Sequence, residues 1–94
     1  MRIERETICR FSAMLSTEGR SKGTIEKYLR DVRAFAAWLD DLEWEEASVW
    51  REHLLEQGYA PVTVNSMLSA VNRFLRFLGR EDCKIKFLRV QRKA

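Results

Sequence analysis

Residues 61–78 place two chemically different surfaces on one helix, and this pattern constrains the fold more than any other feature of the chain. At about 100° per residue, the apolar side chains share one stripe: Val64, Met67, Leu68, Val71, Phe74, Leu75 and Leu78. The opposite side carries Asn65, Ser66, Ser69, Asn72, Arg73 and Arg76. Such a stripe is typical of an amphipathic helix that packs on a core through one face.

The polar side of this helix has no carboxylate. An ordinary solvated helix face usually mixes Glu with Lys, because the two pair across one turn. Asn, Ser and Arg without acid suit phosphate oxygens and base edges, which are mostly hydrogen-bond acceptors on an anionic scaffold. A polar face that only meets water remains the alternative.

The same apolar pattern occurs 39 residues earlier. Phe35 lies at the position of Phe74, Gly19 at that of Gly58, and Trp38 at that of Phe77. Across the two helices the aligned residues are Thr24, Ile25, Tyr28, Leu29, Val32, Phe35 and Leu39 against Thr63, Val64, Met67, Leu68, Val71, Phe74 and Leu78. The match indicates either an ancient duplication or the shared geometry of two amphipathic helices. In both cases the chain provides two helices of similar size.

Composition favours a single all-α domain. The chain has 94 residues, of which 46% are hydrophobic, with only four Gly and one Pro, and no segment shows the period-two alternation of strands. No apolar run approaches the roughly 18 residues of a membrane helix, and no signal-peptide core is present. Cys9 and Cys83 form one distant pair and favour reduced thiols in a cytoplasmic protein. With one histidine and no close pair of cysteines, we expect no metal and no cofactor.

Four helices are expected. The first spans about residues 3–16, with Ile8, Phe11 and Leu15 facing inward. The second runs from Gly23 or Thr24 to Leu39, capped by Ser21 or Thr24. The third spans about 45–57 and the fourth about 61–78. The inner face of the third is predicted to be Val49, Trp50 and Leu54. After the fourth helix we expect a tail that is extended or briefly helical.

Charge is distributed unevenly along the chain. Residues 40–57 hold seven acids and one base (a balance of −6), whereas residues 71–94 hold eight bases and two acids (a balance of +6). This asymmetry indicates an anionic partner for one side of the molecule. No pairing of a nucleophile with a base supports catalysis, and His53 on the acidic third helix is interpreted as a surface or packing residue. The chemistry of the chain is therefore predicted to be binding.

Two groups of residues resemble the core-binding, SAM-like N-terminal domain of tyrosine recombinases and phage integrases. The first group is residues 21–25, Tyr28, residues 31–32, Phe35 and residues 38–39, which resembles the second helix of that domain. The second group is residues 58–65, 68–71 and 74–78, which looks like its fourth helix. The resemblance covers about residues 4–88 and implies a four-helix SAM-like orthogonal bundle that closes over duplex DNA like half of a clamp.

The resemblance also implies which residues contact DNA, because the counterparts of the second and fourth helices face the major groove. Carried across, the second helix contributes Lys22, Thr24, Lys27 and Arg30, and the fourth contributes Thr63, Asn65, Ser66, Ser69, Asn72, Arg73 and Arg76. From the fourth helix, Asn72, Arg73 and Arg76 are expected to face outward and to read base edges, since arginine can pair with guanine and asparagine with adenine.

The strand-exchange residues of the family belong to a separate C-terminal catalytic domain, and nothing after Leu88 resembles it. Tyr28 and Tyr59 do not match the setting of the nucleophile. We therefore expect a non-enzymatic domain over residues 1–88 and the start of a basic linker over residues 89–94, in which Arg89, Arg92 and Lys93 would cross DNA. The partners implied are double-stranded DNA, the catalytic domain of the same polypeptide and other recombinase protomers on DNA, with no membrane. The origin would be bacterial or phage.

Two other classes of function stay open on the sequence. A stand-alone helical DNA-binding regulator would share the same basic and polar surface. A helical protein–protein adaptor would instead use Trp38, Phe77 and the acidic third helix.

Overall fold

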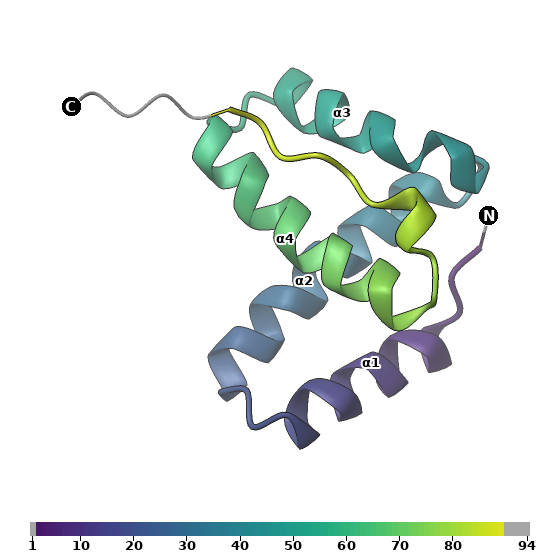
Figure 1. Cartoon of the computed structure of the whole chain (residues 1–94), viewed down its shortest axis with the longest axis vertical. Coiled ribbons are helices and arrows are strands. Elements are labelled where there is room, and N and C mark those ends of the chain that lie inside the picture. Colours follow the sequence, from purple (N-terminus) through teal and green to yellow (C-terminus); the bar gives the residue numbers. More distant parts are fainter. Residues whose placement is uncertain (1, 90–94) are drawn as a thin grey trace.

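The structure, a computed structural model, describes residues 2–89 and confirms the all-α class. Four helices and two 3-10 turns follow one another along the chain: α1 (Arg5–Thr17), α2 (Lys22–Leu39), η1 (Trp44–Val49), α3 (Trp50–Glu56), α4 (Pro61–Phe77) and η2 (Glu81–Cys83). The molecule measures 40 × 32 × 22 Å. The long helices α2 and α4 cross in the middle, with α1 on one side and α3 on the other (Figure 1).

The helix boundaries follow from local signals in the sequence. The Ser21 hydroxyl caps α2 by accepting from the N–H of Thr24 at 3.2 Å, and Pro61 occupies the first turn of α4, where its missing N–H costs nothing. Gly19 and Gly58 end the helices before α2 and α4 with φ angles of +81° and +90°. Side chains with a Cβ are strained in this left-handed region, so both turns depend on glycine.

The prediction for the third helix is wrong in both its helix type and its inner face. Instead of one α-helix over 45–57, the chain forms the 3-10 turn η1 and then a short α3. Because a 3-10 turn has 3.0 residues per turn rather than 3.6, the inward positions shift: Ala47 is fully buried, while Val49 is 52% exposed. Trp50 and Leu54 are buried as predicted.

The 39-residue offset extends through both halves of the fold. The ring of Phe11 on α1 packs edge-on against Phe74 at 5.1 Å and 72°. Its counterpart at the same offset, Trp50 on α3, packs edge-on against Phe35 at 5.2 Å and 71°. An aromatic residue of the α1–α2 half therefore packs against α4, and one of the α3–α4 half packs against α2. These two contacts join the halves into one core.

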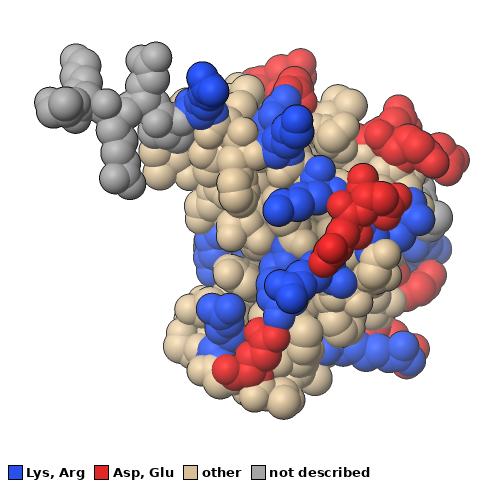
Figure 2. Space-filling model, in the orientation of Figure 1, with Lys and Arg blue, Asp and Glu red and all other residues tan. Residues whose placement is uncertain are grey.

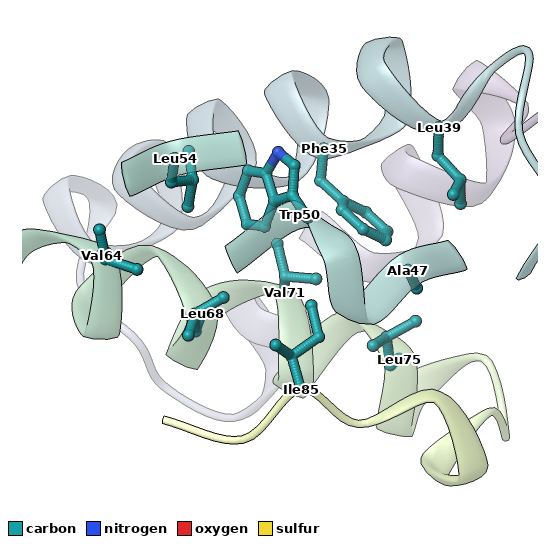
Figure 3. Close-up of a cluster of buried hydrophobic side chains, with 10 residues drawn as sticks. All are labelled: Phe35, Leu39, Ala47, Trp50, Leu54, Val64, Leu68, Val71, Leu75 and Ile85. Carbon is teal, nitrogen blue, oxygen red and sulfur yellow. The ribbon is translucent and has the colours of Figure 1, made fainter. Parts of the chain in front are cut away.

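Two clusters of buried side chains make up that core. One joins α1, α2 and α4 around Phe11, Val32 and Phe74. The other joins α2, α3 and α4, and its members are Phe35, Leu39, Ala47, Trp50, Leu54, Val64, Leu68, Val71, Leu75 and Ile85 (Figure 3). Ile85 comes from the chain after α4, so this part of the chain belongs to the core.

The chain after η2 turns back along α4 instead of leaving the domain. We call residues 84–89 the C-terminal segment. It runs without regular secondary structure between α3 and α4, toward the beginning of α4 (Figure 1). The expected tail, extended or briefly helical, is thus a 3-10 turn followed by an extended segment that is packed on the domain.

Candidate nucleic-acid interface

The polar sides of α2 and α4 border a row of surface hollows, which together we call the α2–α4 groove. It consists of three adjoining hollows that share lining residues: Tyr28 and Ser69 line the first two, and Lys27 and Ser66 line the second and third. Arg20, Arg73, Arg76 and Lys84 line one end of the groove, and Arg30, Thr63 and Tyr59 line the other.

Nine of the eleven residues assigned to DNA on the two helices line this groove. They are Thr24, Lys27, Arg30, Thr63, Ser66, Ser69, Asn72, Arg73 and Arg76. Lys22 and Asn65 line none of its three hollows. On the face that carries α4 and the C-terminal segment, Lys and Arg side chains run down the middle, and acidic side chains lie at the top, to the right and at the lower end (Figure 2).

Lys27 is engaged inside the fold. Its Nζ lies 2.8 Å from Oδ2 of Asp31, whose side chain is only 4% exposed. The same Nζ donates to the carbonyl oxygen of Ser66 on α4 at 2.8 Å. Asp31 is the buried carboxylate of the domain's described part, and Lys27 neutralises it while bridging α2 to α4.

The three residues expected to face outward on α4 differ in exposure. Arg73 is 22% exposed and forms an ion pair with Glu18 at the end of α1. Arg76 is 70% exposed and lies 3.6 Å from Glu81, which is itself 69% exposed. An exposed ion pair of this kind contributes little stability, so the guanidinium of Arg76 can exchange its partner for another anion.

Asn65 and Asn72 hold the C-terminal segment, so Asn72, which was expected to be free on the outer face of α4, is partly exposed and already engaged within the domain. Asn72 donates through Nδ2 to the carbonyl oxygen of Ile85 and accepts from its N–H through Oδ1, both at 2.8 Å. Asn65 does the same with Leu88, at 2.9 and 2.7 Å. Each amide thus satisfies one backbone donor and one backbone acceptor, as a neighbouring β-strand would.

Besides Glu81, the first hollow of the groove is lined by four residues that were not among the expected DNA contacts: Arg20, Tyr28, Lys84 and Phe87. Arg20 lies in the turn before α2, and Lys84 and Phe87 lie in the C-terminal segment. For Lys84 the signal in the sequence was the basic character of the region after residue 71, whereas Arg20, Tyr28 and Phe87 had no comparable signal. In the expected linker, Arg89 is exposed, while Arg92 and Lys93 lie outside the described residues.

Other kinds of site have little support in residues 2–89. This part of the chain brings no three metal-ligating side chains together, and none of its helices has the length and apolar character that crossing a membrane requires. His53 lies with its ring 5.7 Å from that of Trp38, and Phe77 packs against Phe11 at 5.5 Å. The aromatic residues considered for an adaptor surface therefore contribute to packing within the domain.

Comparison with known proteins assigns the chain to a family. Residues 8–82 match the family described as the phage integrase N-terminal SAM-like domain, and the chain belongs to it. One relative is the tyrosine recombinase XerA of Thermococcus kodakarensis, which is 34% identical over 77 residues. The aligned region is 82% of this chain but only 27% of XerA, so the chain spans little more than a quarter of that relative. No solved structure matches the chain.

Proposed function

We propose that this chain is the DNA-binding N-terminal domain of a tyrosine recombinase and that it holds duplex DNA along the α2–α4 groove. Strand breakage and rejoining would be carried out by a catalytic domain of the same polypeptide. The family membership and the likeness to XerA support the recombinase context. The main support for DNA binding is the groove itself. It is lined by polar and cationic side chains of α2 and α4, together with Arg20 from the turn before α2 and Lys84 from the C-terminal segment.

The charges of the groove suit a phosphodiester backbone. Arg20, Arg30, Arg73, Arg76 and Lys84 line it with Lys27, and hydroxyls of Thr24, Thr63, Ser66 and Ser69 lie between these cations. Arginine, lysine and hydroxyl side chains make most phosphate contacts in protein–DNA interfaces. Of the three residues assigned to base edges, Arg76 has the most exposed guanidinium and the best access to a major groove.

Binding to duplex DNA is expected to fall steeply with salt, since cations that bind phosphates release counterions. With about four to six phosphate contacts, a plot of log K against log salt should have a slope of roughly −4 to −5. Fluorescence anisotropy of a labelled duplex, titrated at several salt concentrations, measures this slope. Binding that is independent of salt, or absent at low salt, would count against the proposed function.

Within the same titration, Arg30→Ala should weaken binding to all duplexes alike and reduce the magnitude of the salt slope by about 1. Arg30 is 75% exposed and lies 4.0 Å from Asp31, so its removal should leave the fold intact. Arg33→Ala is the matched control, because Arg33 is exposed on the same helix but lines a different hollow with Cys9 and Ser12. Equal effects of the two variants would show that only net charge matters.

Glu18→Gln is expected to act in the opposite direction and to strengthen DNA binding a few-fold at low salt. The carboxylate of Glu18 pairs with Arg73 and lies 3.8 Å from Arg20, and it would repel a phosphate placed between them. Glu6→Gln is the control, since Glu6 is an exposed acid of α1 that pairs with Arg10 and does not line the groove. If both changes raise affinity equally, the end of the groove near Arg73 does not contact DNA.

A further inference from the structure

The end of the α2–α4 groove next to the C-terminal segment gathers cations from three separate parts of the chain. Arg20 comes from the turn between α1 and α2, Arg76 from the last turn of α4, and Lys84 from the start of the C-terminal segment. Arg73 also lines this hollow, and Glu81 is the one carboxylate among the residues that line it. The hollow therefore has a local balance of +3 (four cations and one anion), which favours an anionic occupant.

The cations of this hollow differ in how far they are already paired. Arg73 is held by Glu18. Arg20 lies 3.8 Å from the same carboxylate, and Arg76 lies 3.6 Å from the exposed carboxylate of Glu81. Lys84 is exposed and forms no ion pair within the described part of the chain. Of the four cations, the ammonium of Lys84 is therefore the one that can bind an anion without breaking an existing ion pair. The hydroxyls of Tyr28 and Ser69 line the same hollow and can donate to an oxygen anion.

Lys84 owes its position to the residue that follows it. Ile85 is 1% exposed in the core, and Figure 3 shows its side chain directed from the C-terminal segment toward Val71. Both backbone groups of Ile85 are paired with the amide of Asn72 at 2.8 Å. The backbone next to Lys84 is therefore fixed to α4 at the same level as Arg73 and Arg76.

We propose that this hollow binds a phosphate of the DNA backbone, with Lys84 as a direct contact and Asn72 as the residue that positions it. The inference rests on the proposed function and adds a third element to it, because the C-terminal segment then forms part of the DNA surface together with α2 and α4. Asn72 acts here through the backbone of Ile85 and reads no base.

The experiment uses the whole 94-residue chain and a labelled duplex, with affinity measured by anisotropy over a range of salt concentrations. Lys84→Ala should weaken binding several-fold and reduce the magnitude of the salt slope by about 1. Lys86→Ala is the matched control, because Lys86 is exposed on the same segment and does not line the hollow. It should change affinity and slope much less.

The role of Asn72 is tested by combining substitutions. Asn72→Ala should weaken binding about as much as Lys84→Ala, and adding Lys84→Ala to it should weaken binding little further, since residues that act as a unit are not additive. Asn65→Ala removes the same two kinds of hydrogen bond at Leu88, and in that background Lys84→Ala should keep its full effect. Melting curves define a temperature at which every variant is folded.

Each result bears on a different claim. If the unaltered chain binds DNA but Lys84→Ala binds as well as Lys86→Ala, the phosphate site is wrong and the proposed function stands. If Lys84→Ala and Asn72→Ala reduce affinity independently, the positioning role of Asn72 is wrong. If the unaltered chain does not bind DNA at low salt, the proposed function itself fails.

Discussion

Replacing Phe74 with alanine is expected to lower the free energy of unfolding by about 3–5 kcal/mol, the range for a large aromatic residue removed from a core. Phe74 is fully buried, and its ring packs against those of Phe11 at 5.1 Å and Phe77 at 6.5 Å. The cavity would lie where α1 meets α4, and a bundle of this size has few other contacts with which to fill it. Denaturant unfolding followed by circular dichroism measures the change.

The same substitution at two other phenylalanines makes the test specific. Phe35 is fully buried at the position equivalent to Phe74 in the first half of the chain, whereas Phe87 is 53% exposed. Phe35→Ala should therefore be as damaging as Phe74→Ala, and Phe87→Ala should change stability by less than about 1 kcal/mol. A midpoint for Phe74→Ala that matches that of Phe87→Ala would show that the core has been assigned to the wrong face of α4.

Lys27→Met is expected to destabilise the domain by about 1–3 kcal/mol, because it leaves the carboxylate of Asp31 buried without its cation. Removing one partner of a fully buried ion pair typically costs about 3–5 kcal/mol. The effect should be smaller here, since Lys27 is 30% exposed and Arg30 lies 4.0 Å from the other carboxylate oxygen. The loss of the hydrogen bond to Ser66 acts in the same direction.

The double variant Lys27→Met/Asp31→Leu separates this explanation from a general intolerance of the site. Without a buried charge to compensate, it should recover most of the stability lost in Lys27→Met, as apolar replacements of buried pairs often do. Thermal melts of the single and double variants provide the comparison. If the double variant is less stable than Lys27→Met, the pair contributes more than the neutralisation of Asp31.

Helix positions and most of the core could be predicted from the sequence because they depend on local properties. A period of 3.6 residues, a capping serine and turn glycines act within a few residues of one another, and they located α1, α2 and α4 within two residues. Val49 is the exception, because it was predicted to face inward and is 52% exposed. The choice between an α-helical and a 3-10 turn at residues 44–49 is not set by apolar periodicity, and it decided whether Ala47 or Val49 was buried.

The tertiary structure decided which partners the polar side chains bind. Asn72 and Arg76 lie four residues apart on the same helix face and are equally able to bind water, DNA or another part of the chain. Only the return of the C-terminal segment along α4 gives Asn72 a backbone partner 13 residues away, and only the packing of α1 brings Glu18 to Arg73. The sequence by itself thus determined α1, α2 and α4, the buried faces of these helices and a surface rich in cations. Long-range packing decided which of the polar groups stay available to a partner. The reason is that the neighbouring residues in the sequence do not specify which group a hydrogen-bonding side chain will bind.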